Sequence, residues 1–247
     1  TLDRSSAASD VYKRQALPEL KIGYLPSISF LELMELFYDN LSALDIGKVH
    51  RLLTIIDLTN VYYCLTDQPL DSRGLWALSE IKESLIELTR FPEYLISFLA
   101  RYTELGQRVE HFPEVYLDYF QVESVNSSGF VRKYMEFEMN LRLYLATNRA
   151  KKFGKEYKSP ISDDETIHNQ FEDLNIALLQ VEDSPLEEYQ IIQQYRINFL
   201  NDMSRAKAFG IDGLLAYMMQ LLIIEDDNVL HEKQGQQTVD KLLEASA

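Results

Sequence analysis

Charged side chains at helical spacing offer the most specific chemistry in this sequence. They lie in residues 128–154, which read SGFVRKYMEFEMNLRLYLATNRAKKFG. On a helix that turns about 100° per residue, Glu138, Arg142 and Arg149 fall on one stripe, and Glu138 and Arg142 have the i,i+4 spacing that lets opposite charges pair. We interpret the stripe as an internal salt-bridge ladder that braces neighbouring helices, because an unpaired buried ion is strongly destabilising. The functional alternative is that part of the ladder faces a partner protein.

Two runs of carboxylates could bind a hard cation or work as an acid/base pair. They are Asp163-Asp164-Glu165 and Glu225-Asp226-Asp227. The first run stands at an expected helix start, where negative charge is favourable, and the second in an expected solvated turn. We therefore favour solvated roles for both runs over a metal site.

Other signatures of catalysis are absent from the sequence. The four histidines lie in separate segments without an HExxH motif, and the nine glycines are scattered singly, without a phosphate-binding loop. We therefore expect a non-catalytic protein with no cofactor and no metal.

Composition narrows the classes of partner. A formal charge of −15 and a pI near 4.7 disfavour nucleic acid and direct adsorption on anionic lipid. No apolar run reaches the eighteen or so residues of a membrane span, and a single cysteine excludes an internal disulfide framework. With 247 residues and 46% hydrophobic content, the chain can bury the core of one large domain, or of two subdomains meeting near residues 126–154.

The first fifteen residues look foreign to the rest. Residues 5–15, SSAASDVYKRQ, match the in-frame translation of a transposase-based sequencing adaptor, whose codons GAT GTG TAT AAG AGA CAG encode Asp10 to Gln15. We therefore expect residues 1–15 to be non-native and the native chain to begin upstream of Ala16. Residues 16–247 then form the helical domain.

The helix expected at 128–154 carries apolar side chains on two opposed sides. One stripe comprises Phe130, Tyr134, Phe137, Leu141, Tyr144 and Leu145, and the other comprises Met135, Met139, Leu143, Ala146, Ala150 and Phe153. A helix of this kind is gripped on both sides as a middle layer. Ser127 or Ser128 can cap its start, and Gly154 can end it in the left-handed conformation.

The remaining chain shows the 3.6-residue period of helices and no convincing strand alternation. Helices are expected to start at Ser29 with Glu32 as a capping box, at Ser42, at Leu75, at Pro92, at Pro113, near Asp163, at Ser184 and after Gly210. A break at 234–237 is expected to precede a short final helix. The fold class is therefore all-α, a bundle of about ten helices around the long central one.

The central stretch EFEMNLRLYLATNRAKKFG resembles the central helix of the C-like family of bacterial V-type (V/A-type) ATP synthase subunits, which is related to the d-type subunits of V-type ATPases. The family pattern is an EFE-x-N core followed by a basic residue and a Lys-x-Gly-like end. The matching positions are Glu136, Phe137, Glu138, Asn140, Arg149, Lys152 and Gly154. ALPEL at 16–20 is similar to the end of the family's opening signature, and the resemblance implies that the short strand before this signature lay in the missing N-terminus. FGIDGLLAYMMQLLIIEDD is similar to the family's C-terminal helix, except that Asp226 and Asp227 replace a basic or aromatic end.

The resemblance implies a non-catalytic adaptor of a rotary ATPase. Such an adaptor links the membrane proteolipid ring to the central stalk and transmits torque, so the implied partners are the ring and the stalk subunits. It also implies a cytoplasmic location, peripheral to the membrane through protein partners and without a span of its own. The alternatives are a free-standing acidic helical interaction module and a carboxylate metal-dependent enzyme.

Overall fold

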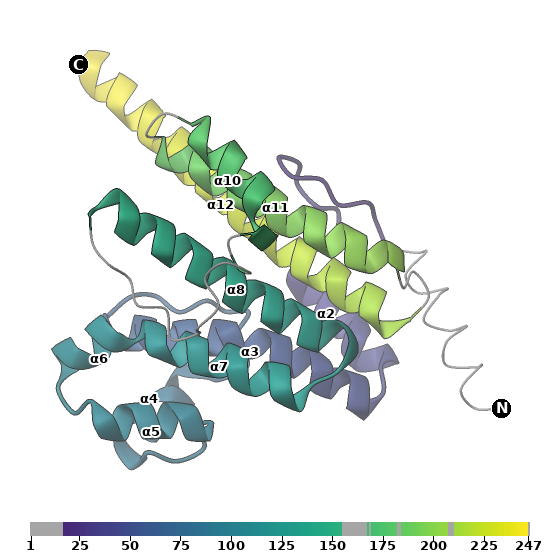
Figure 1. Ribbon diagram of the computed structural model, residues 1–247, viewed down its shortest axis with the longest axis vertical. Coiled ribbons are helices and arrows are strands. Elements are labelled where there is room, and N and C mark those ends of the chain that lie inside the picture. The colour runs from purple at the N-terminus through teal and green to yellow at the C-terminus, as the bar shows by residue number, and fades with distance from the viewer. Residues whose placement is uncertain (1–16, 155–166, 168, 182–183, 207–209, 247) are drawn as a thin grey trace. The chain divides into compact units, whose positions relative to one another are not determined.

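The computed structural model describes the backbone of residues 17–154, 167, 169–181, 184–206 and 210–246 (Figure 1). The expected adaptor-derived segment and the carboxylate run at 163–165 lie outside these residues. Within them the chain is all-helical, with ten helices and no strand. This confirms the expected all-α class. The chain divides into two compact units, one formed by residues up to Asn40 together with Glu172–Ala247, the other by Leu41–Phe171.

The unit Leu41–Phe171 contains the central helix. Its helices are α3 (Ala43–Leu65), α4 (Leu78–Glu87), α5 (Glu93–Arg101), α6 (Leu105–His111), α7 (Pro113–Asn126) and α8 (Gly129–Lys152). Helices α7 and α8 form an antiparallel hairpin across the short link Ser127-Ser128, and α3 contacts both (Figure 1). Aromatic rings fill the core here, among them Phe112, Tyr119 and Phe120, each no more than 2% exposed.

The other unit is built on a long helical pair. Its helices are α2 (Phe30–Asn40), α10 (Glu172–Leu179), α11 (Pro185–Ala206) and α12 (Ile211–Ser246). Helices α11 and α12 lie side by side, and α2 packs against α12. Leu214, Leu215 and Ala216 open a nearly continuous buried stretch of α12. This stretch is the apolar run that made the helix so evident in the sequence.

Local capping explains why several helices begin where the sequence predicts. The Ser29 backbone N–H donates to Glu32 Oε2 (2.8 Å) and the Glu32 N–H donates to Ser29 Oγ (3.2 Å), which completes the expected capping box of α2. Ser42 accepts from the Asp45 N–H at the start of α3 (3.2 Å). Ser184 accepts from the Glu187 N–H at the start of α11 (3.3 Å). These starts are therefore confirmed.

Four local expectations are wrong. The helix expected from Leu75 begins at Leu78, and the stretch expected as one helix after Pro92 is split between α5 and α6. Ser128 occupies the N-cap of α8, but its side chain makes no capping hydrogen bond. The break expected at 234–237 does not occur, because α12 continues to Ser246.

Arg108 explains the split between α5 and α6. Its Nε donates to the Tyr102 carbonyl (2.7 Å) and its Nη2 to the Leu99 carbonyl (3.2 Å). These contacts satisfy carbonyls that the last turn of α5 leaves without helical partners. Tyr102 itself is extended, with φ −108° and ψ 100°, so the chain turns before α6.

Candidate functional site

The central helix α8 is packed on two sides along its first part, and its last residues are exposed. Five residues of the first apolar stripe are buried: Phe130, Tyr134, Phe137, Leu141 and Tyr144. On the second stripe Met135 and Leu143 are buried, whereas Phe153 is 73% exposed. The expected middle layer is therefore present as far as Leu143, and the final turns leave it. Gly154 has φ +65°, which confirms the left-handed end of the helix.

Glu138 and Arg142 form the ion pair that their spacing predicts. Arg142 Nε lies 3.4 Å from Glu138 Oε2, and the Glu138 side chain is 3% exposed against 39% for Arg142. The contact is an ion pair without hydrogen-bond geometry at Nε. The carboxylate is thus held inside the unit, while the guanidinium reaches toward water.

Two aromatic rings of α7 complete the surroundings of Arg142. Its guanidinium carbon lies 5.6 Å from the centre of the Tyr116 ring and 5.2 Å from that of Phe120. Cations are attracted to ring faces within about 6 Å. Burial raises the pKa of the Tyr116 hydroxyl, which lies 3.3 Å from Thr59 Oγ1 on α3. Arg142 therefore links a buried carboxylate of α8 to the aromatic face of α7.

The other family-motif residues are placed separately from this pair. Glu136 accepts from Arg132 Nε (2.8 Å) in an exposed i,i+4 pair, and Asn140 Nδ2 donates to Gln170 Oε1 (3.0 Å). Arg149 is exposed and has no ion-pair partner among the described residues. The structure therefore joins two members of the predicted three-residue ladder and leaves Arg149 at the surface.

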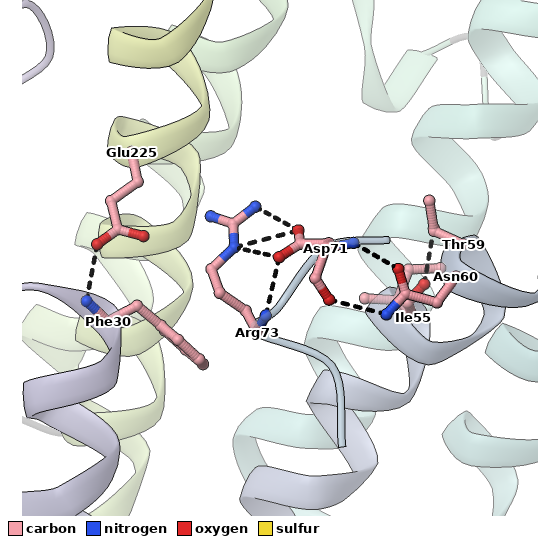
Figure 2. A network of polar contacts seen from close by, with 7 residues as sticks. All are labelled: Phe30, Ile55, Thr59, Asn60, Asp71, Arg73 and Glu225. Atoms are coloured by element: carbon pink, nitrogen blue, oxygen red, sulfur yellow. Dashed lines mark hydrogen bonds and ion pairs between the residues drawn. The ribbon is translucent and has the colours of Figure 1, made fainter. Parts of the chain in front are cut away.

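The carboxylate run 225–227 was expected in a solvated turn, and this expectation is wrong. The run lies in the middle of α12, where three successive side chains point in different directions. Glu225 Oε1 accepts from the Phe30 N–H (2.7 Å) at the start of α2, as Figure 2 shows. Asp227 is 1% exposed, and its Oδ2 lies 3.6 Å from Nε2 of His231, one turn along the helix. Glu225 therefore joins α12 to α2, whereas Asp227 is buried beside His231 of its own helix.

The described histidines also have local structural partners. His111 stacks on Tyr102, with ring centres 4.5 Å apart, and its Nδ1 lies 3.2 Å from Glu114 Oε1. Across the described part of the chain, no group of three or more His, Cys, Asp or Glu side chains has an arrangement that could hold a metal ion.

Sequence reasoning missed a polar cluster under the loop that follows α3. Asn60 Nδ2 donates to the Asp71 carbonyl (2.9 Å), and the Asp71 N–H donates to Asn60 Oδ1 (2.8 Å), as Figure 2 shows. Asp71 also forms an ion pair with Arg73 (2.6 Å). The signal was present, because Asn60 and Asp57 stand at i,i+3 among the apolar residues of α3.

Asp57 anchors the next part of the same loop. Its Oδ1 accepts from the backbone N–H groups of Leu75 (2.6 Å) and Trp76 (2.9 Å), while its Oδ2 is buried without a hydrogen-bond partner. Burial raises the pKa of this carboxyl to about 6. A Cβ atom added at Gly74 would lie 2.5 Å from Asn60 Nδ2 and 2.9 Å from Asp57 Oδ1, so only glycine fits between the two side chains. We call Asp57, Asn60 and Gly74 the loop anchor.

Within the part that the structure describes, no helix combines the length and the apolarity needed to cross a bilayer.

Comparison with known proteins shows the family to which the chain belongs, but the description of that family names no activity. A family model described as "Protein of unknown function (DUF2764)" matches residues 11–246. A Chlamydia muridarum protein named "Uncharacterized protein" is 23% identical over 246 residues, covering 87% of this chain and 90% of its own length. A protein with the same printed name from Chlamydia trachomatis serovar D is 25% identical over 227 residues, covering 80% and 84%. No solved structure matches the chain.

Proposed function

The chain belongs to the DUF2764 family of proteins of unknown function, and we propose that it is a non-catalytic rotor adaptor of a V/A-type ATP synthase. In this role it joins the membrane proteolipid ring to the central stalk and passes torque between them. The proposal rests on the resemblance of its central helix to that of the C-like family of V-type ATP synthase subunits.

The structural observation that supports the proposal is the packing of α8, together with the ion pair on α8 that lies against α7. Glu138 and Asn140 of the motif stand on a 24-residue helix whose first part is buried on two sides, and Glu138 pairs with Arg142 against two rings of α7. Torque passes through packed elements that resist deformation and needs no reactive group. A long helix braced by packing and by an ion pair with a buried carboxylate suits that task.

The direct test is co-expression of the chain with the ring and central-stalk subunits of the rotary ATPase from the same organism. We expect a tag on this chain to purify both sets of subunits in one complex, and expect ATP-driven ion pumping to be lost when the chain is omitted. Omission should leave ATP hydrolysis by the catalytic head in place, because an adaptor couples the two motors and does not perform the chemistry.

Two results would contradict the proposal. A chain that purifies alone in the presence of all ring and stalk subunits would be a free-standing interaction module. Micromolar binding of a divalent cation, together with a reaction that depends on that cation, would support the carboxylate enzyme instead.

A further inference from the structure

Asp227 is a buried carboxylate of α12 without a hydrogen bond. Its side chain is 1% exposed, and neither of its oxygens has a hydrogen-bond partner in the part of the chain that the structure describes. A buried carboxylate that lacks donors is strongly destabilising. His231 lies closest to supplying one, because its Nε2 is 3.6 Å from Asp227 Oδ2, just beyond hydrogen-bond distance.

The same nitrogen of His231 also contacts α11. Nε2 of Gln190, in the second turn of α11, lies 3.4 Å from Nε2 of His231. The amide nitrogen of glutamine can only donate, so this contact is a hydrogen bond when the imidazole nitrogen carries no proton. An ionised carboxylate can only accept, so Asp227 needs an Nε2 that does carry a proton. One nitrogen thus faces two partners that require opposite protonation states.

Only a small movement separates the two arrangements. Asp227 and His231 stand at i and i+4 on one helix, so their side chains are neighbours. A shortening of less than about 1 Å brings Nε2 into hydrogen-bond distance of Oδ2, and a rotation of the His231 side chain can supply it. A protonated Nε2 has no lone pair to offer, so Gln190 then loses its acceptor.

The neighbouring groups of α11 do not change charge with His231. Tyr189 of α11 interacts electrostatically with Asp226 and Asp227, and Arg196 acts on the same tyrosine. Burial raises the pKa of the Tyr189 hydroxyl, so this group stays neutral, and arginine stays charged throughout the physiological range. Histidine is the side chain that ordinarily changes charge between pH 5 and 8.

Helix α2 brings no charged side chain to the buried side of α12. Its buried residues are apolar, and its acids are exposed: Glu32, Glu35 and Asp39. Its backbone N–H at Phe30 donates to Glu225, and the Tyr24 carbonyl before it accepts from Asn228 Nδ2. Among the described residues around Asp227, His231 is therefore the group whose charge answers to mild acid.

We propose that Gln190, His231 and Asp227 form a proton-operated latch between α11 and α12. In mildly alkaline solution the neutral ring accepts a hydrogen bond from Gln190 and ties the start of α11 to α12. In mild acid Nε2 gains a proton and donates to Asp227, which satisfies the buried carboxylate within α12 and releases Gln190. The start of α11 is therefore held less firmly as pH falls. This regulation is independent of the proposed rotor function.

Hydrogen exchange of the complete chain tests the link to α11. We expect the protection factors of the backbone amides of residues 189–193 to be about 5-fold lower at pH 5.5 than at pH 8, which corresponds to one hydrogen bond of about 1 kcal/mol. His231→Gln should remove this pH dependence. Gln190→Ala should lower protection at pH 8 to the value that the unsubstituted chain has at pH 5.5.

The matched control is Gln194→Ala, one turn further along α11. Gln194 Nε2 donates to Asn198 Oδ1 (2.9 Å), and neither side chain titrates. This variant should keep the about 5-fold difference between the two pH values.

Urea denaturation tests the link to Asp227. We expect Asp227→Asn to raise the urea midpoint by about 0.5 M at pH 8, where the carboxylate has no donor, and to change it by less than about 0.2 M at pH 5.5, where His231 supplies one. In a chain that also carries His231→Gln, the effect of Asp227→Asn should be the same at both pH values.

The outcomes decide the proposal. Equal protection of α11 at pH 5.5 and 8 overturns the latch, and so does a loss of protection in acid that persists in His231→Gln. An effect of Asp227→Asn that still varies with pH beside His231→Gln would show that Asp227 takes the proton itself, which overturns the role of His231. A loss of the pH dependence in Gln194→Ala would show that the start of α11 responds to acid as a whole and not through this histidine.

Discussion

Replacing Arg142 by methionine tests whether the ion pair of α8 braces the fold. Methionine keeps most of the apolar stem that packs beside Tyr116 and Phe120, and it removes the charge. Glu138, with a side chain 3% exposed, then keeps a buried carboxylate without this cation.

The structure sets the expected size of the effect. Breaking a fully buried pair costs about 3–5 kcal/mol, and losing a cation–π contact costs about 0.5–1 kcal/mol at an exposed site. The Arg142 side chain is 39% exposed, so water screens part of the pair. We therefore expect Arg142→Met to lower the free energy of unfolding by about 2–4 kcal/mol, as measured by urea denaturation.

The chain supplies a matched control on the same helix. Arg132 and Glu136 have the same i,i+4 spacing, but their side chains are 59% and 44% exposed. Arg132→Met should therefore cost about 0–1 kcal/mol. Adding Glu138→Gln to Arg142→Met should recover part of the loss, because the buried charge is removed as well. Equal small costs at Arg142 and Arg132, with additive double variants, would refute the bracing role.

Three further predictions concern the loop anchor and the N-terminus. Gly74→Ala should lower the free energy of unfolding by about 1–3 kcal/mol, because the added Cβ atom clashes with Asn60 and Asp57. Gly47→Ala, at an open position of α3, should raise the free energy of unfolding by about 0.5–1 kcal/mol. Urea denaturation that gives the two variants the same change in stability would contradict the close packing at Gly74. The Asp57 carboxyl has a pKa of about 6 in the folded chain, against 3.8 in its unperturbed form. Between pH 4 and 6 the folded chain therefore keeps a proton that the unfolded chain has lost. For this reason the contribution of Asp57 to the free energy of unfolding falls as pH rises. Measured from pH 4 to 7, the stability of Asp57→Asn relative to the unsubstituted chain should therefore rise by about 2 kcal/mol, and a flat difference would show that this carboxyl is not perturbed. Deleting residues 1–15 should change stability by less than about 1 kcal/mol in thermal melts, and a larger loss would show that the segment packs against the fold.

The sequence predicts those parts of the fold that neighbouring residues decide. The starts of α2, α3 and α11 follow from a serine that accepts a hydrogen bond from a backbone N–H three residues later. The end of α5 does not follow in this way, because a side chain of the next helix, Arg108, satisfies its carbonyls. The run at 225–227 resembled a turn because three successive charges interrupt an apolar stretch. Within the helix, Glu225 accepts a hydrogen bond from the N-terminus of α2, about two hundred residues away in the chain. A contact at that distance cannot be read from the residues next to Glu225.

The candidate sites show the same limit. Glu138 and Arg142 could be paired from the sequence, because both stand on one helix at a spacing that fixes their distance. The loop anchor could not be found, because Asp57 and Asn60 bind backbone groups 11 to 19 residues further along. A polar residue on the buried side of a helix indicates that a partner exists, since buried polar groups are hydrogen-bonded, but it does not say which segment supplies the partner.

Helix α8 carries two ion pairs at the same spacing, and their contributions can be measured separately. Arg132 pairs with Glu136 and Arg142 with Glu138, and the two arginines lie about 15 Å apart along the helix axis. Sites at this separation without shared partners usually contribute additively. A chain carrying both Arg132→Met and Arg142→Met should therefore lose the sum of the two single costs in urea denaturation, to within about 0.5 kcal/mol. A loss that differs from this sum by more than about 1 kcal/mol would show that the two pairs brace the helix together and that neither acts on its own.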